Sequence, residues 1–323
     1  MPVARRRVLL LTVAALSALA SGAGAENYPA RPVRLIVGFA AGSTTDVLAR
    51  LIAQWLSVRL GQQVVVENRP GAGGNLAAGT VVKAVPDGYT LLMVPPAVAA
   101  NAALYEHLSF DFIADTAPVA GVARMPNIAV VHPSVPVKTI PELIAYAKAN
   151  PGKLSYASAG IGTPSFLAGQ LFNVMTGTKL QNVSYRGDGP AMADLVAGQV
   201  PMAFASMVAA IEHIRAGEFR PLGVTTLKRS DALPDVPSIS EFVPGYETSS
   251  WFGIAAPRST APDIVDMVNR ETNAGLADPT LRARLAALGS VPLPGSPADF
   301  GKLIADETEK WGNLIRTAGI KAE

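Results

Sequence analysis

The sequence predicts an α/β fold with a largely parallel sheet, divided between two domains. Short apolar runs alternate with segments of helical periodicity from Val33 onward, which is the pattern of strands joined by crossover helices. A length of 323 residues is enough for two domains with separate hydrophobic cores. The chain has 49% hydrophobic and 16% charged residues, a globular composition, because disordered chains have less apolar content and more net charge.

The first part of the chain predicts three strands and two helices. Apolar runs place the strands at Val33–Val37, Gln63–Glu67 and Tyr89–Val94. After the first strand, a helix ended by Gly61 is predicted from helical spacing of Val47, Leu48, Leu51, Ile52, Trp55 and Leu56. The second helix is expected at Leu76–Val85, between a loop over 68–75 and a turn over 86–88.

The alternation restarts after Asn127 and continues to the end of the chain. Apolar runs predict strands at Ile128–Val131, Leu154–Ala157, Val183–Tyr185, Val200–Ala205, Leu222–Thr225 and Trp251–Ala255. Helical periodicity predicts helices at Ile140–Ala149, Ser165–Met175, Pro190–Ala197, Ala209–Ala216, Asp263–Leu276, Pro279–Leu288 and Pro297–Ala318. The last three helices have no sheet of their own to cover.

Composition excludes several classes of function. The chain has no cysteine, which excludes disulfides, thiolate nucleophiles, iron–sulfur clusters and cysteine-ligated zinc. Its three histidines are far apart in sequence, so we expect no metal site, and no motif predicts a cofactor. A formal net charge of +2 argues against nucleic acid as a partner.

The N-terminal segment has the three parts of a secretory signal peptide. Arg5, Arg6 and Arg7 precede an apolar stretch that begins at Val8, and small residues follow up to Ala23-Gly24-Ala25. The apolar stretch is shorter than the roughly 20 residues of a membrane span, which is the alternative interpretation. Cleavage after Ala25 would remove three arginines and no acidic residue, leaving 24 basic and 25 acidic residues. We expect a periplasmic protein.

Two strand–loop–helix junctions combine glycines with hydroxyl side chains. The first contains Phe39, Ala41, Gly42, Ser43, Thr44, Thr45 and Asp46, and the second contains Ser158, Ala159, Gly160, Gly162, Thr163 and Ser165. A helix N-terminus carries unpaired N–H groups and a partial positive charge, so it can bind an anion without lysine or arginine. If the two junctions face each other, they form a cleft that suits a small mono- or dicarboxylate. Plain helix capping is the alternative for each junction.

Two other motifs predict different chemistry with weaker support. Gly71-Ala72-Gly73 follows a strand, but the third glycine of a dinucleotide-binding loop is replaced by Leu76. Ser158 lies in a sequence resembling a nucleophile elbow, and Asp194 and His213 follow in hydrolase order. A secreted serine hydrolase is therefore the alternative function.

The mature chain resembles the Bug (Bordetella uptake gene) family, the substrate-binding proteins of tripartite tricarboxylate transporters. The resemblance extends from Tyr28-Pro29 to Ala318-Gly319-Ile320. Its most specific parts are Val64-Val65-Val66-Glu67-Asn68-Arg69-Pro70-Gly71-Ala72-Gly73-Gly74-Asn75 and Pro86-Asp87-Gly88-Tyr89-Thr90-Leu91-Leu92.

The resemblance implies a two-domain periplasmic-binding-protein (Venus flytrap) fold with a ligand cleft between the domains. Domain 1 would combine 26–125 with 248–323, and domain 2 would be 126–247. The family's function implies a monomeric binder, not an enzyme, that passes a dicarboxylate, tricarboxylate, aromatic acid or acidic amino acid to a membrane permease. A sensor for a two-component system is a further alternative.

The resemblance also implies that the ligand lies between the two junctions. This sequence departs from the family pattern at Ala205, which follows Phe204 where an acid is usual. An acid there would be a natural partner for a ligand cation. Its replacement favours a ligand without an amine.

Overall fold

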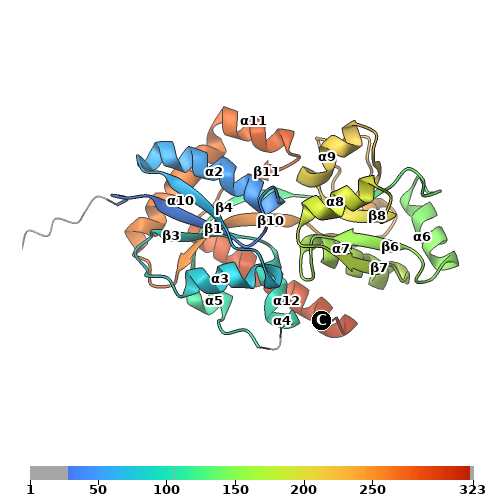
Figure 1. Cartoon of the computed structure of the whole chain (residues 1–323), viewed down its shortest axis with the longest axis horizontal. Coiled ribbons are helices and arrows are strands. Elements are labelled where there is room, and N and C mark those ends of the chain that lie inside the picture. The colour runs from blue at the N-terminus through green and yellow to red at the C-terminus, as the bar shows by residue number, and fades with distance from the viewer. Residues whose placement is uncertain (1–27, 106, 321–323) are drawn as a thin grey trace, which may run out of the picture.

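The computed structural model describes residues 28–105 and 107–320, which form two α/β lobes lying side by side (Figure 1). The signal peptide expected over 1–25 lies outside these residues.

The first lobe is built on a six-stranded sheet with the order β11-β4-β10-β3-β1-β2. Its strands are β1 (Val33–Val37), β2 (Val64–Asn68), β3 (Thr90–Val94), β4 (Thr116–Met125), β10 (Ser250–Pro257) and β11 (Val291–Pro292). Its helices are α2 (Thr44–Leu60), α3 (Asn75–Val82), α4 (Ala97–Leu104), α5 (Phe112–Asp115), α10 (Pro262–Ala277), α11 (Pro279–Ala287) and α12 (Pro297–Ala318). A short 3-10 turn, η1 (Ala72–Gly74), precedes α3.

The second lobe is built on a five-stranded sheet with the order β7-β6-β8-β5-β9. Its strands are β5 (Asn127–Val131), β6 (Ser155–Ser158), β7 (Gln181–Ser184), β8 (Met202–Ser206) and β9 (Arg220–Val224). Its helices are α6 (Ile140–Ala149), α7 (Pro164–Thr176), α8 (Asp188–Val196) and α9 (Met207–Arg215), with a 3-10 turn, η2 (Ile239–Glu241), before the return to the first lobe.

The prediction of a largely parallel sheet is wrong, because both sheets are mixed. β1 pairs in parallel with β2 and β3, and β6 with β7 and β8, but β10 is antiparallel to β3 and β4, and β5 is antiparallel to β8 and β9. The reason is the chain path. β5 and β10 each begin directly after a crossing from the other lobe, so each runs away from the interface, whereas their neighbours run toward it.

The segment from 95 to 125 holds elements that the sequence patterns did not predict. Most residues of α4 are buried, so its alanine-rich sequence lacks the polar face that marks a surface helix. β4 contains Pro118 and Gly121, which are unfavourable in strands, and its pairing with β10 has irregular register. All the helices and strands that the sequence did predict are present, with boundaries shifted by at most three residues.

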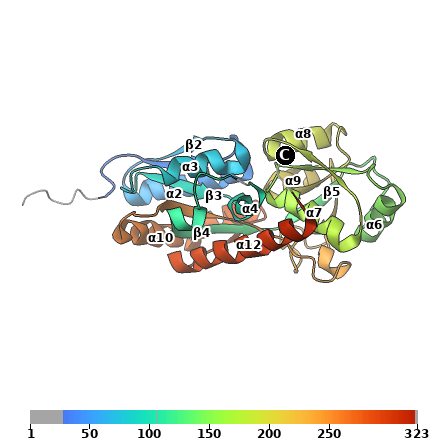
Figure 2. The ribbon, with the colours of Figure 1, turned by 90° about the horizontal axis from the view of Figure 1, so that it is seen from below.

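Helix α12 connects the two lobes from outside. Figure 2 shows it lying along the first lobe with its last turns beside the second. Its buried Ile315 belongs to the hydrophobic cluster that contains Leu104 of α4 and Phe166 and Leu167 of α7. The two lobes therefore share one apolar cluster in addition to the strand crossings.

The chain crosses between the lobes at 125–127 and again before Ser250, and a polar network joins the two crossings. The backbone N–H of Asn127 donates to Thr225 Oγ1 at 2.9 Å, and this hydroxyl donates to the Thr248 carbonyl at 2.8 Å. Ser250 Oγ donates to Asn127 Oδ1 at 2.7 Å. We propose domain boundaries of 26–125 with 248–323, and 126–247, because both crossings lie at these positions.

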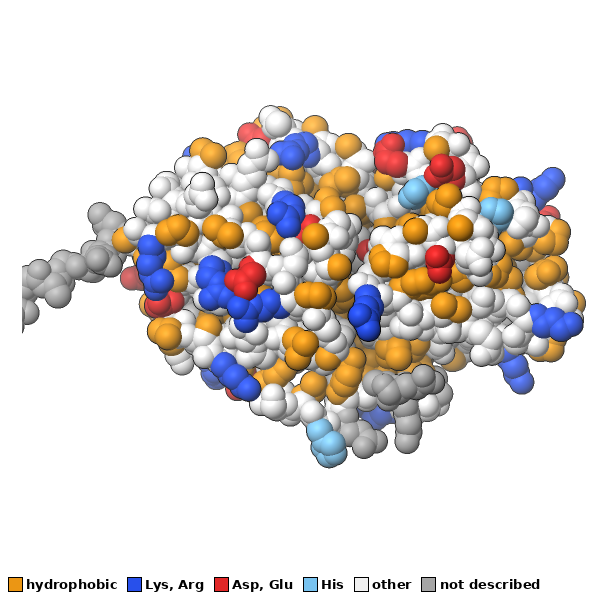
Figure 3. All heavy atoms as spheres, viewed as in Figure 1, with side chains coloured by type: hydrophobic (Ala, Val, Ile, Leu, Met, Phe, Trp, Pro, Cys, Tyr) orange, Lys and Arg blue, Asp and Glu red, His pale blue; other side chains and the backbone are white. Residues whose placement is uncertain are grey.

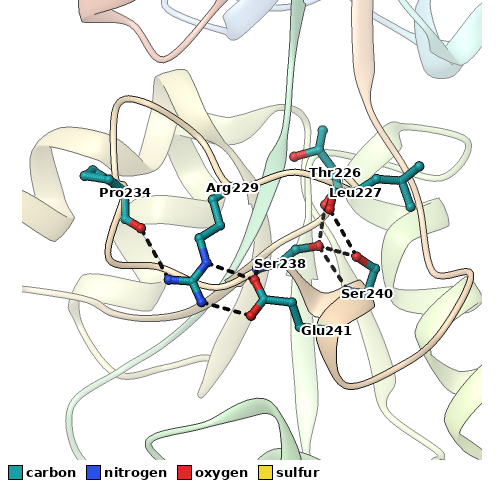
Figure 4. Close-up of polar contacts among 7 residues, drawn as sticks. All are labelled: Thr226, Leu227, Arg229, Pro234, Ser238, Ser240 and Glu241. Carbon is teal, nitrogen blue, oxygen red and sulfur yellow. Dashed lines mark hydrogen bonds and ion pairs between the residues drawn. The ribbon is translucent and has the colours of Figure 1, made fainter.

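An ion pair closes the Pro-rich passage that follows β9 (Figure 4). Arg229 Nε and Nη2 each donate to the Glu241 carboxylate at 2.9 Å, and Nη1 donates to the Pro234 carbonyl. Glu241 also accepts from the Ser238 N–H. The hydrogen bonds from Arg229, and then from Ser238, lower the pKa of Glu241 to about 2. Any stabilisation from this pair is present above the ordinary glutamate pKa and is lost as the pH falls through about 2.

Candidate functional site

A pocket of about 40 Å³ lies between the lobes, where five helices begin. α2 and α4 approach it from the first lobe, and α7, α8 and α9 approach it from the second. Its lining consists of Phe39, Ser43, Thr44, Thr45, Pro95, Pro96, Ala97, Asn127, Ala159, Thr163, Pro164, Ser165, Asp188, Ser206, Ser250 and Phe252. A helix N-terminus carries a partial positive charge, so the beginnings of these five helices make the pocket favourable for an anion.

The first predicted junction is folded around Asp46. Its carboxylate accepts from the Gly42 N–H and from Asn68 Nδ2, both at 2.9 Å, and pairs with Arg50. Burial alone would raise the pKa of Asp46, but the hydrogen bonds from Arg50, Gly42 and Asn68 hold it below its usual range. Asp46 thus holds the loop in place through its hydrogen bonds and does not itself line the pocket. Its neighbours Ser43, Thr44 and Thr45 do line it.

The second junction holds its own loop in a similar way. Ser165 Oγ accepts from the Ala159 N–H at 2.9 Å and lies 3.0 Å from Thr163 Oγ1. Thr163 is the N-cap of α7, with Pro164 at the first helical position. Ala159, Thr163 and Ser165 line the pocket, so both predicted junctions reach it.

The other predicted site residues lie beside the pocket lining. Ser158 is buried and accepts from Asn182 Nδ2, and Ala205 is buried in the core of the second lobe. Gly160 lines a neighbouring cavity, whereas Gly162 lies against Leu104 and Asn101 of the first lobe. Ala41 and Gly42 are exposed on the loop before α2.

Sequence patterns missed Asp188 and Ser206, which begin or cap α8 and α9. Thr44 Oγ1 donates to Asp188 Oδ2 at 2.8 Å and lies 2.7 Å from Ser206 Oγ, so these contacts join the lobes through the pocket. Asp188 and Ser206 also lie where a strand gives way to a helix. Searching every strand–helix junction, and not only the two rich in glycine and hydroxyl side chains, would have found them.

Asp188 is a buried carboxylate held by neutral donors. It is 9% exposed, and its contacts are the Thr44 N–H and the hydroxyls of Thr44 and Ser206. Loss of water around the carboxylate raises its pKa, although the hydrogen bonds act in the opposite direction. A charged Asp188 therefore reduces the stability of this arrangement of the lobes.

Replacing Asp188 with asparagine should raise the thermal midpoint at pH 7 by about 2–4 °C, which corresponds to roughly 1 kcal/mol. The amide carries no charge, and its oxygen can still accept from Thr44. Because burial raises the pKa in the folded state, the cost of the carboxylate is present at neutral pH and disappears below the unfolded value of about 3.9. Melting curves from pH 7 to pH 4 should show the difference shrinking, and a less stable variant at pH 7 would contradict this account.

The hydrolase residues are not joined in the structure. Ser158 accepts from Asn182, Asp194 accepts from the Tyr185 hydroxyl at 2.7 Å, and His213 pairs with Glu218. Each member of the predicted triad thus has a different partner. Within the described part of the chain, therefore, neither Asp194 nor His213 is paired with Ser158 as a general base would be.

A larger cavity of about 450 Å³ adjoins the pocket, and Phe39 and Ala159 line both. Its further lining includes the Gly-rich loop around Gly71, together with Tyr185 and Arg186. The Gly-rich loop therefore forms one wall of this larger cavity. The two cavities together offer room for a ligand larger than the small pocket alone.

The pocket lining contains hydroxyls, an amide and one carboxylate, with no lysine, arginine or histidine among the described residues. Within those residues, no group of three or more His, Asp or Glu side chains could hold a metal ion. On the outer surface, Figure 3 shows Lys and Arg side chains standing singly or beside Asp and Glu. The arrangement suits a small anion bound by dipoles.

Comparisons with known proteins identify the family and the fold. The family described as tripartite tricarboxylate transporter family receptor matches residues 48–320. Protein BugT of Bordetella pertussis (strain Tohama I) is 36% identical over 310 residues, 95% of each chain. The structure of R. palustris Rpa4515 with adipate is 40% identical, with a TM-score of 0.89, covering 91% of this chain and 100% of that chain. MatC from Rhodopseudomonas palustris, with bound malate, is 33% identical, with a TM-score of 0.84, covering 89% and 100%.

Proposed function

This chain belongs to the tripartite tricarboxylate transporter receptor family, and we propose that it captures a small carboxylate between its two lobes. The observation that carries this proposal is the meeting of five helix N-termini from both lobes at one pocket. Two similar proteins were solved with dicarboxylates, adipate and malate, which supports the same ligand chemistry here.

The energetics favour a site shared by both lobes. A hydrogen bond to a charged group contributes about 1.5–3 kcal/mol, whereas micromolar affinity corresponds to about −8 kcal/mol. Several donors are therefore required. We propose that Ser43, Thr44 and Thr45 on one side, and Ser165 and Ser206 on the other, supply them together as the lobes close, while Ala159 and Thr163 complete the lining.

The family consists of receptors, so we propose binding without turnover, as a periplasmic monomer that delivers its ligand to a membrane permease. Transport is preferred to sensing because the matching family is defined by a transporter's receptor. Across the residues that the structure describes, none of the helices is both long and apolar enough to cross a bilayer.

A thermal-shift screen of the mature chain from Glu26 tests the proposal. The panel contains mono-, di- and tricarboxylates, aromatic acids and acidic amino acids. A ligand that binds only the folded state adds about 2.7 kcal/mol of stability at a hundredfold excess over Kd. We expect a clear shift with at least one acid class. Absence of a shift with every acid, together with esterase activity that Ser158→Ala removes, would contradict the proposal.

A further inference from the structure

Asp188 places a buried carboxyl group in the pocket, where a carboxylate ligand is expected. Of the described residues that line the pocket, Asp188 alone carries a formal charge. It is 9% exposed, and the ion pairs of the described residues do not include it. A second anion entering this pocket would therefore meet an uncompensated buried carboxylate.

The donors and the carboxylate form two subsites that adjoin at the interface. Thr44 presents its N–H and hydroxyl from the first turn of α2, and Asp188 faces them from the first turn of α8 in the other lobe. When the lobes separate, Thr44 retains donors for an anion and Asp188 retains an acceptor for a cation. A ligand that carries both charges on neighbouring atoms matches this pair.

We propose that the ligand is an amine-bearing carboxylate, an inference that rests on the proposed function. Asp188 binds its protonated amine, and Thr44 and the helix N-termini bind its carboxylate. This assignment replaces the amine-free ligand suggested by Ala205 alone, because α8 supplies the acid that the end of β8 lacks. A zwitterion brings a cation for Asp188 and an anion for the donors. The adjoining 450 Å³ cavity leaves room for the remainder of the molecule.

The test compares acids that differ by one ammonium group. Succinate is paired with aspartate, glutarate with glutamate, and adipate with 2-aminoadipate, and butyrate with 2-aminobutyrate covers neutral side chains. Calorimetric affinities are measured for the wild type, for Asp188→Asn, and for Asp194→Asn as a matched control. Asp194 is on the same helix, but it accepts from Tyr185 and does not line the pocket.

We expect the amine-bearing member of the best-bound pair to bind the wild type at least tenfold more tightly. Asp188→Asn should reduce that preference by at least tenfold, and Asp194→Asn should retain it. The inference is overturned if the plain acid binds more tightly, or if Asp188→Asn leaves the ratio unchanged, and carboxylate capture would still stand. Failure to bind any of these eight acids, together with every other acid of the thermal-shift panel, would instead count against the proposed function itself.

Discussion

Replacing Thr225 with valine should destabilise the protein by about 2–4 kcal/mol, because it removes the hydroxyl that joins the two crossings. Thr225 is fully buried, and its Oγ1 both accepts from the Asn127 N–H and donates to the Thr248 carbonyl. Valine has nearly the same shape, so the change leaves two buried backbone groups without partners. Each such group costs about 1–3 kcal/mol. Urea denaturation followed by tryptophan fluorescence measures the loss.

The adjacent threonine provides the control for this prediction. Thr226 Oγ1 donates to the Lys228 carbonyl in an exposed loop, so Thr226→Val should change stability by less than about 0.5 kcal/mol. Equal effects of the two valines would show that the network between the crossings contributes nothing particular to stability.

Gly162→Ala should weaken ligand binding at least about tenfold, or roughly 1.4 kcal/mol, by keeping the lobes apart. Gly162 belongs to the second lobe, and a Cβ there would lie 2.9 Å from Leu104 Cδ1 and 3.0 Å from Asn101 Oδ1 of the first lobe. Asn101 cannot easily move away, because its Nδ2 donates to the Gly73 carbonyl and to Asn75 Oδ1. Affinity is measured for the acid that gives the largest thermal shift.

Gly177→Ala separates this steric effect from the backbone cost. Both glycines have left-handed backbone angles, with φ of 78° at Gly162 and 65° at Gly177. A Cβ at Gly177 meets nothing within 4 Å. Both variants should lose similar stability, about 1–2 kcal/mol, but only Gly162→Ala should lose affinity. Equal affinities would mean that binding does not require the lobes to approach at Gly162.

The sequence predicted the helices and strands where their patterns are local. Gly61 ends α2 in the left-handed conformation, as predicted, and α7 begins at Pro164, one residue before its predicted start. The family resemblance and the two-domain α/β fold are confirmed. Strand direction could not be predicted in this way, because β5 and β10 owe their reversal to crossings that bring together residues about 120 positions apart. Asn127 and Ser250 show no such relation in the sequence.

The site was predicted only where glycines made a junction conspicuous. Thr44 and Ser165 lie at such junctions, and the structure brings both to the pocket. Ser206 directly follows the alanine selected from the family pattern, and it is Ser206 that lines the pocket. Asp188 also lies where a strand gives way to a helix, but an acid in the first turn of a helix is ordinary capping chemistry, so it did not stand out as a site residue. Its burial depends on Thr44, which is 144 residues away.

The helix N-termini around the pocket also bear on how quickly a ligand can arrive. Their partial charges act within about one helical turn, and Arg186, at the wall of the adjoining cavity, is the one basic side chain in the described lining of the two cavities. Encounter with an anion therefore depends on diffusion, with little steering over longer distances. Dissolved salt screens exposed charges over about 10 Å, and few such charges surround this site. The association rate constant of the ligand should therefore be similar at low and at high ionic strength.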